Sequence, residues 1–225
     1  MIDALQIDTK GGPAAAELAL PPGDGKVPGI IVVHEWWGIN DDIRRLLGRF
    51  AAEGIAALAV DLYAGRSTTD PMEALQLSND LRTPRAVEII AGGADALAAH
   101  ARSNGKVAVT GFCLGGAMTL AAACNVDTLR AAVPFYGTPK DEHANGWAAK
   151  CPILGHYAKN DGFVSIERAR LIAETVNAAG GSFELHEYDA GHAFMREADP
   201  TAYHAPSAQL AWERTIAFLK KHLAH

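Results

Sequence analysis

The chain has 225 residues, 49% of them hydrophobic and 20% charged, which is typical of a globular protein and excludes a disordered or fibrous one. Its 26 acidic and 20 basic residues give a net charge of −6, and an acidic chain without a basic stripe is not expected to bind nucleic acid. The length suits one domain, residues 1–225, and no apolar run reaches the roughly 18 residues of a membrane span.

The N-terminal part of the chain predicts a hairpin, a buried strand and an amphipathic helix. Residues 5–9 and 16–20 flank two glycines and predict a hairpin at one edge of a sheet. The continuous apolar run 30–33 is typical of a strand that is buried on both faces. A helix is expected next, with N-cap residues at 40–41 and an end at Gly54.

Strands and helices continue to alternate along the rest of the chain. The further predicted strands are residues 56–62, 106–110, 131–135, 152–156 and 183–188. The further predicted helices are a short one within 64–83, then 84–101, one that starts near 114, 165–179, and 207–222 with Ser207 as its cap. This alternation predicts an α/β fold, a mostly parallel sheet flanked by helices on both faces. In such sheets functional residues gather at the carboxyl ends of the strands.

Residues 111–116, Gly-Phe-Cys-Leu-Gly-Gly, lie directly between a predicted strand and a predicted helix. The pattern Gly-x-nucleophile-x-Gly is that of a nucleophile elbow, with Cys113 as the nucleophile. Its glycines let neighbouring chain pass close to a sharp turn, and the helix N-terminus favours a thiolate. The backbone N–H of Leu114 is expected to point to the place where an oxyanion would form.

Two other interpretations of Cys113 remain open. A glycine-rich turn between a strand and a helix can hold a phosphate, although this spacing matches neither a dinucleotide fingerprint nor a P-loop. A cysteine can also be a small apolar core residue, which is the interpretation that we give to Cys124 and Cys151. Three cysteines do not make a disulfide framework, so the thiols are expected to be reduced.

A nucleophile of this kind needs a general base and a group that orients the base. In enzymes with a nucleophile elbow the acid and then the histidine follow the nucleophile along the chain. Asp161 lies 48 residues after Cys113, and His192 lies 31 residues after Asp161, each just past a predicted strand. These three residues are the predicted triad. Asp189 is the competing acid, but it is too near His192 in sequence to orient it from another strand.

The loop after the first long strand reads His34-Glu35-Trp36-Trp37-Gly38. A loop in this place supplies the second oxyanion donor, which we assign to the backbone N–H of Trp36. Trp36 and Trp37 are either core residues or, beside a carboxylate, the wall of a substrate pocket. No second histidine completes an H-E-x-x-H motif and no cluster has zinc spacing, so no metal is expected.

Four segments carry a resemblance to a known family: residues 61–63 (Asp-Leu-Tyr), 111–116, 161–163 (Asp-Gly-Phe) and 191–194 (Gly-His-Ala-Phe). Together they resemble the dienelactone hydrolases, or carboxymethylenebutenolidases, over almost the whole chain. The resemblance implies an α/β-hydrolase fold with a catalytic triad of Cys113, His192 and Asp161.

The resemblance also implies roles for residues around the triad. Glu35 matches a glutamate that contacts the thiol and helps to generate the thiolate when substrate arrives. Arg196 matches an arginine that pairs with this glutamate and then binds a substrate carboxylate. Without the resemblance, Arg196 would be interpreted as an ordinary arginine of a surface loop. Phe163 and Tyr136 match pocket-lining positions. A second carboxylate-binding arginine of the family has no counterpart within residues 71–78, so dienelactone itself remains open as a substrate.

The sequence therefore predicts a hydrolase without a cofactor, which cleaves an enol-lactone or an activated, carboxylate-bearing ester through a thioester on Cys113. One alternative is a carboxylesterase or thioesterase of the same fold that acts on uncharged esters. The other is a protein in which Cys113 serves only as a peroxide-sensitive thiol. We expect a small-molecule substrate and neither a nucleic-acid nor a membrane partner. We also expect a cytoplasmic monomer, because signal-peptide, coiled-coil and repeat patterns are missing.

Overall fold

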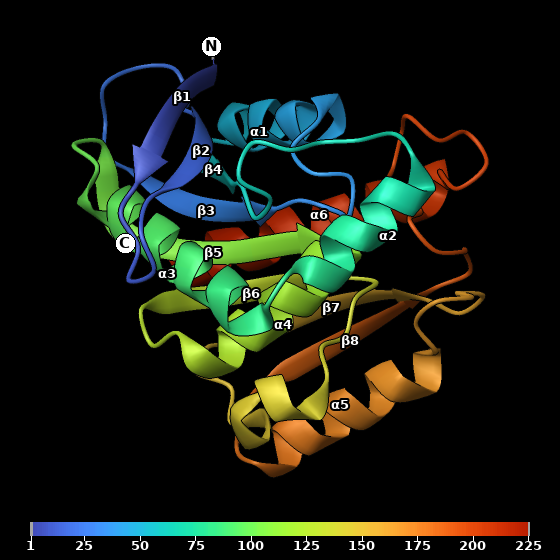
Figure 1. Cartoon of the computed structure of the whole chain (residues 1–225). Helices are drawn as coiled ribbons and strands as arrows, with labels where there is room; N and C mark the ends of the chain where they lie inside the picture. Colours follow the sequence, from blue (N-terminus) through green and yellow to red (C-terminus); the bar gives the residue numbers. More distant parts are fainter. Residues whose placement is uncertain (1, 225) are drawn as a thin grey trace.

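The computed structural model describes residues 2–224, which form one eight-stranded sheet covered by helices (Figure 1). The strands are β1 (Ile2–Ile7), β2 (Ala14–Ala19), β3 (Val27–Val33), β4 (Ala56–Val60), β5 (Ser103–Phe112), β6 (Leu129–Phe135), β7 (Ile153–Ala158) and β8 (Phe183–Tyr188). Their order across the sheet is β1-β2-β4-β3-β5-β6-β7-β8. Strand β2 is antiparallel to β1 and β4, and all other neighbours are parallel. The predicted sheet and its edge hairpin are confirmed.

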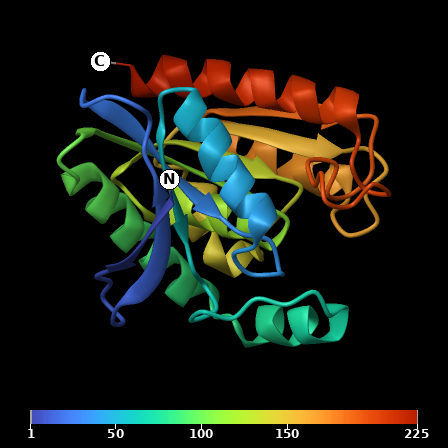
Figure 2. The ribbon, with the colours of Figure 1, turned by 90° about the horizontal axis from the view of Figure 1, so that it is seen from above.

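Helices cover both faces of the sheet, and one helix stands apart. They are α1 (Asp41–Ala52), α2 (Pro71–Asp80), α3 (Thr83–Ala99), α4 (Leu114–Asn125), α5 (Ile166–Ala178) and α6 (Ala205–Leu223), with short 3₁₀ turns at Asp141–His143 and Asn145–Trp147. Helices α3, α4 and α5 pack on one face, and α1 and α6 pack on the other. Figure 2 shows α2 set off from both layers, on the chain between β4 and α3.

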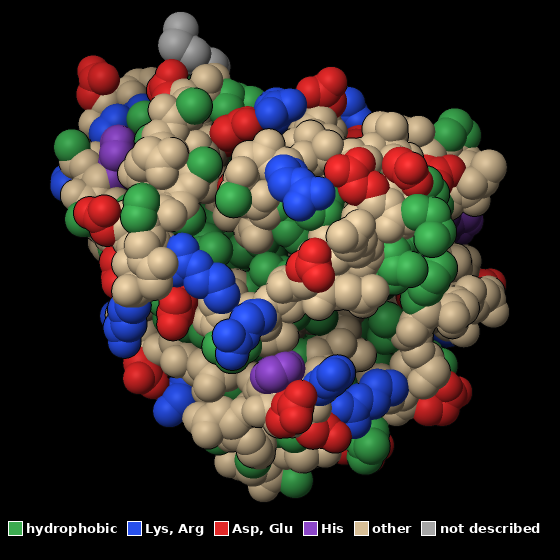
Figure 3. Space-filling model, in the orientation of Figure 1, with side chains coloured by type: hydrophobic (Ala, Val, Ile, Leu, Met, Phe, Trp, Pro, Cys, Tyr) green, Lys and Arg blue, Asp and Glu red, His purple; other side chains and the backbone are tan. Residues whose placement is uncertain are grey.

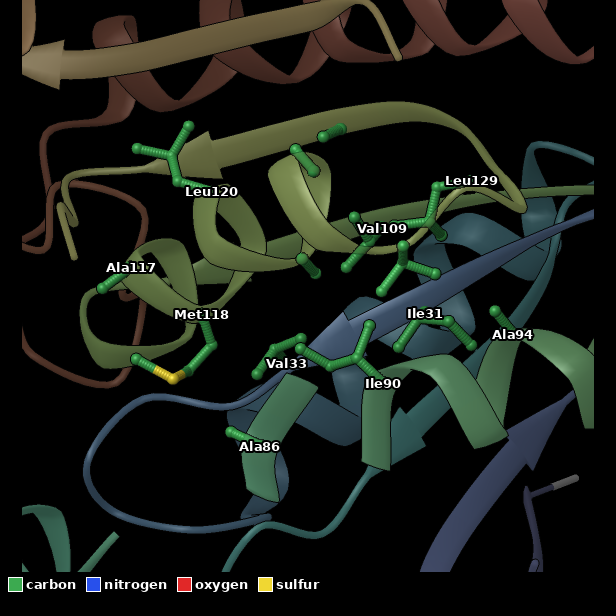
Figure 4. Close-up of a cluster of buried hydrophobic side chains, with 14 of the residues drawn as sticks. Ile31, Val33, Ala86, Ile90, Ala94, Val109, Ala117, Met118, Leu120 and Leu129 are labelled. Carbon is green, nitrogen blue, oxygen red and sulfur yellow. The ribbon is translucent and has the colours of Figure 1, made fainter. Parts of the chain in front are cut away.

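Strand β3 shows how an apolar run holds the two layers together. Successive side chains of a strand point to opposite faces. Ile30 and Val32 belong to the hydrophobic core under α1 and α6, whereas Ile31 and Val33 belong to the core under α3 and α4. All four are fully buried, at about 1.5–3 kcal/mol of stabilisation per side chain. Figure 4 shows Ile31 and Val33 beside Ile90 of α3.

The helix signals in the sequence are confirmed in one case and corrected in another. The side chain of Asn40 accepts a hydrogen bond from the backbone N–H of Ile43 at 3.2 Å, as an N-cap should. Helix α1 ends just before Gly54, whose φ of 83° suits glycine. Ser207, however, does not cap the last helix. Helix α6 already begins at Ala205, because proline is favoured in a first turn, and the Ser207 hydroxyl hydrogen-bonds the His204 ring at 2.8 Å.

The topology brings the carboxyl ends of the parallel strands β3 to β8 to one edge of the molecule, at the right of Figure 1. The segments that directly follow β3, β5, β7 and β8 carry all the residues of the predicted triad and the predicted oxyanion donors, with Leu114 as the first residue of α4. On the face seen in Figure 3, acidic and basic side chains are interspersed rather than gathered by sign. Within residues 2–224, none of the helices has the length and apolar character needed to cross a membrane.

Candidate active site

Cys113 lies at a strained turn where β5 ends and α4 begins. Its φ of 54° and ψ of −114° are unusual for any residue with a side chain. The backbone N–H of Cys113 still donates to the carbonyl oxygen of Phe135 in β6 at 3.1 Å, and its own carbonyl accepts from Ala117 in α4 at 3.1 Å. The surrounding sheet and helix therefore hold the strained residue in place, and its thiol is partly exposed at the N-terminus of α4.

The two glycines after the elbow are required by close backbone contacts. A Cβ atom at Gly115 would collide with the carbonyl oxygen of Val33, and one at Gly116 would collide with that of Phe135. Helix α4 therefore starts directly against the ends of β3 and β6. This close packing brings the first turn of α4 beside the loop after β3, where the second oxyanion donor is expected.

His192 and Asp161 meet in the loops after β8 and β7. The Nδ1 atom of His192 lies 2.8 Å from Oδ2 of Asp161, whose side chain is almost fully buried. The other carboxylate oxygen, Oδ1, accepts backbone hydrogen bonds from Phe163 at 2.8 Å and Val164 at 3.0 Å. Asp161 is thus fixed in position and fixes one edge of the imidazole ring. The competing acid, Asp189, is exposed and instead accepts a hydrogen bond from Asn160 at 3.3 Å.

Hydrogen bonds decide the charge states of this pair. Burial alone would lower the pKa of His192, but hydrogen bonds to Asp161 and to the Cys113 sulfur raise it to about 10. Burial alone would raise the pKa of Asp161, yet the bonds from His192 and from two backbone N–H groups lower it. The arrangement therefore favours an imidazolium between the Asp161 carboxylate and the Cys113 sulfur.

His34 is a fully buried histidine that ties the loop after β3 to the loop after β4. Its Nε2 accepts from the backbone N–H of Leu62 at 3.1 Å, so its Nδ1 is the protonated nitrogen and donates to the carbonyl oxygen of Glu35 at 2.5 Å. The backbone N–H of Gly38 also donates to this oxygen, at 3.3 Å. The Glu35 carbonyl and the Trp36 N–H belong to one planar trans peptide, so they point in opposite directions. His34 therefore fixes the direction of the Trp36 N–H.

His34 is expected to make the protein less stable below pH 6.5. Burial lowers its pKa below 6.5, outweighing the opposing effects of the Glu35 carbonyl and the Asp61 charge. As the pH falls below 6.5 the unfolded chain binds a proton at this residue and the folded chain does not, so the free energy of unfolding decreases. Urea titrations between pH 7 and 5 should show that the free energy of unfolding decreases less steeply with falling pH in His34→Gln than in the wild type. Equal slopes in the wild type and in His34→Gln would contradict this account.

Glu35, Tyr136 and Arg196 form a partly buried cluster beside the triad. The Tyr136 hydroxyl donates to Oε1 of Glu35 at 3.3 Å, and Nε of Arg196 lies 3.9 Å from Oε2. Burial raises the pKa of Glu35, and the nearby charges of Arg196 and His192 offset only part of that rise. The Arg196 guanidinium also lies 4.7 Å from the centre of the Trp37 ring.

One pocket of about 240 Å³ opens beside the Cys113 sulfur. Besides Cys113, its lining includes six other predicted site residues: Glu35, Trp36, Trp37, Phe163, His192 and Arg196. The Phe163 ring is 80% exposed and stands 4.8 Å from the His192 ring, at the mouth of the pocket. Tyr136, which was also predicted to line the pocket, does not line it. It is fully buried behind the histidine, with ring centres 5.1 Å apart.

Sequence reasoning missed three side chains near the site. Asp42 and Asp199 lie 3.7 and 3.8 Å from the Arg196 guanidinium, so three carboxylates surround one arginine. The Tyr63 hydroxyl is buried without a hydrogen-bond partner among residues 2–224, and its pKa is raised by burial and by the neighbouring Cys113. The Asp-Leu-Tyr segment, which was used only for the family resemblance, is the signal that could have identified this tyrosine. In the described part of the chain, no three His, Cys, Asp or Glu side chains come together as metal ligands would.

Comparison with known proteins gives a consistent result. The family model described as "Dienelactone hydrolase family" matches residues 14–223. The chain belongs to this family. The protein usf of Aquifex pyrophilus is 34% identical over 228 residues, which is 97% of this chain and 98% of that protein. A carboxymethylenebutenolidase of Pseudomonas putida is 31% identical over 230 residues, covering 97% and 96% of the two chains.

A solved structure agrees with the sequence relatives of the dienelactone hydrolase family. It is a candidate dienelactone hydrolase of Klebsiella pneumoniae, 29% identical to this chain, with a TM-score of 0.82 and coverage of 96% and 97%. The expected resemblance and the α/β-hydrolase fold are thereby confirmed, as is the expectation that the protein is an enzyme of the hydrolase class.

Proposed function

We propose that the protein hydrolyses carboxylic esters and enol-lactones with good leaving groups through a Cys113–His192–Asp161 triad. The observation that carries the proposal is the 2.8 Å contact between His192 and buried Asp161, beside the partly exposed Cys113 thiol in its strained elbow. The names of the relatives, which include carboxymethylenebutenolidases, support a substrate of this chemical class.

In the first half of the reaction the Cys113 thiolate attacks the carbonyl carbon, and the carbonyl electron pair moves to oxygen. The resulting oxyanion is met by the backbone N–H groups of Leu114 and Trp36, which contribute about 3 kcal/mol each. The oxyanion then collapses, the bond to the leaving oxygen breaks, and the His192 imidazolium gives that oxygen its proton. A thioester on Cys113 and a neutral His192 remain.

In the second half neutral His192 takes a proton from water, and the hydroxide attacks the thioester carbon. Collapse of this second oxyanion expels the Cys113 thiolate and releases the carboxylic acid, and the proton remains on His192. Asp161 keeps the ring oriented in both steps and stabilises its positive charge. A thiolate is a weaker base than an amide nitrogen, so the first oxyanion from an amide would expel the thiolate again. This favours activated esters and lactones as substrates.

The role proposed for Glu35 follows from its environment. Its buried carboxylate shares Arg196 with two other acids, so loss of the Arg196 contact would make Glu35 a stronger base near the thiol. The family resemblance predicts that a substrate carboxylate removes Arg196 in this way. A second candidate function, hydrolysis of uncharged esters, is favoured by the same observation, because Arg196 already has three carboxylate neighbours.

An acyl-enzyme should be detectable on Cys113. Mixing the protein with excess 4-nitrophenyl acetate should release a burst of up to one nitrophenolate per protein, and acid quenching should trap one acetyl group on the peptide that contains Cys113. Both the burst and the acetylation should be absent from a Cys113→Ala variant, which has no nucleophile at this position. An acetyl group found only on Cys124 or Cys151, or turnover without any thioester, would contradict the proposal.

A further inference from the structure

A second cavity, of about 310 Å³, lies against the catalytic pocket on the other side of Glu35 and Arg196. Both side chains line both spaces, so together they form the partition between them. The second cavity lies between α1, the end of β5 and the chain that follows His192. Its volume is at the lower end of the roughly 300–1,000 Å³ usual for small-molecule sites.

The walls of this cavity are mainly apolar. Ile43 and Leu46 come from α1, Phe112 from the end of β5, and Met195 from the segment after the triad histidine. The charged side chains at its rim pair with one another: Arg49 contacts Glu197 at 3.4 Å, and Arg45 contacts Asp42. The cavity thus offers apolar contact, and the charges of these four rim residues are paired.

The partition is not locked in place. Nε of Arg196 is buried without a hydrogen-bond partner among residues 2–224, and the guanidinium meets its three carboxylates only at 3.7–3.9 Å. These distances are too long for hydrogen bonds, so turning Arg196 aside breaks ion pairs and its contact with Trp37 but no hydrogen bond. Three acids already surround this guanidinium, so a substrate carboxylate would have to displace one of them to reach it.

We infer that the cavity under α1 receives the uncharged acyl chain of the ester, which passes between Glu35 and Arg196 while its carbonyl carbon lies at Cys113. This inference rests on the proposed ester hydrolysis and adds the class of acyl group, a neutral chain of several carbons. Each methylene that enters the cavity should raise kcat/KM by about three- to fourfold, the factor that burial of one methylene supplies.

Gly48 offers a way to narrow the cavity without touching the triad. It lies at the solvent side of the cavity in α1, and a Cβ atom built there meets nothing within 4 Å. Alanine at this position adds little volume and suits a helix. Leucine adds a side chain that can reach over the cavity, and Leu46→Phe narrows the same cavity from a position two residues earlier in α1.

The test compares 4-nitrophenyl acetate, butanoate and hexanoate in the wild type, Gly48→Ala, Gly48→Leu and Leu46→Phe. The wild type and Gly48→Ala should prefer hexanoate. In Gly48→Leu or Leu46→Phe, kcat/KM for hexanoate should fall about tenfold or more, which corresponds to the lost contact of two methylenes. For acetate, kcat/KM should fall less than about twofold. Thermal unfolding of each variant separates this selective loss from damage to the fold.

A charged partner substrate completes the test. The mono-4-nitrophenyl ester of adipic acid has a six-carbon acyl group like hexanoate, with a carboxylate in place of the terminal methyl group. Its kcat/KM should be at least about tenfold lower than that of hexanoate, because the charge would have to be desolvated. Equal chain-length profiles in all four proteins, or faster reaction of the adipate ester, would overturn the inference while leaving the triad intact. Ester turnover that survives Cys113→Ala would instead overturn the proposed function.

Discussion

Replacing Cys113 by alanine is expected to reduce kcat for every ester substrate by about 10⁴-fold or more, as loss of a catalytic nucleophile does. The variant keeps the Cβ atom, the backbone hydrogen bonds to Phe135 and Ala117, and therefore the elbow. Its circular dichroism and thermal unfolding should match those of a folded protein. The residual rate then reflects what the oxyanion donors and substrate binding provide without covalent catalysis.

The other two cysteines supply matched controls for loss of a thiol. Burial raises the pKa of Cys124 to about 11, despite Lys150 nearby, and burial raises that of Cys151 to about 12. Both are therefore neutral core residues at physiological pH, and their alanine variants should keep the wild-type kcat within about twofold, since neither touches the chemistry. Iodoacetamide should label Cys113 first. Full activity in Cys113→Ala, or loss confined to Cys124→Ala, would refute the assigned nucleophile.

Most of the fold could be predicted from local signals in the sequence. The apolar run Ile30–Val33 predicted a strand that is buried on both faces, because successive side chains point to opposite faces and here both faces meet an apolar layer. The elbow around Cys113 could be recognised because such a sharp turn from strand to helix brings backbone segments so close together that glycine is needed at these positions. Asp161 and His192 could be chosen because the order of the triad along the chain follows from the order of the strands.

Features that depend on packing between distant segments could not be predicted in this way. Asp42 lies in the first turn of α1, and it meets Arg196, which follows β8, only because the sheet places both segments over the same strand ends. By sequence alone His34 is one more histidine at a strand end, and its role as a tie between two loops depends on Leu62 in the loop after β4. The cavity under α1 is likewise a property of how α1 meets Met195.

Asp161→Asn is expected to lower kcat by about 10³- to 10⁴-fold, the loss seen when a triad acid becomes an amide and the histidine is held in the wrong tautomer. Burial alone lowers the pKa of His192, and the hydrogen bond to Asp161 is the first interaction that raises it, toward about 10. In the Asp161→Asn variant, His192 should therefore titrate at a lower pH than in the wild type. Imidazole proton or nitrogen resonances of His192, followed by NMR between pH 5 and 11, measure this directly.

The same shift has a consequence for stability, because His192 binds its proton more tightly in the folded chain than in the unfolded one. Its stabilising contribution is complete below pH 6.5 and is lost as the pH rises toward about 10. The difference in unfolding free energy between the wild type and Asp161→Asn should therefore narrow over that range. Asp189→Asn is the matched control, since Asp189 also follows a strand but is exposed and bonded to Asn160. If Asp161→Asn keeps the wild-type rate and the wild-type titration of His192, another group orients the histidine and the triad assignment fails.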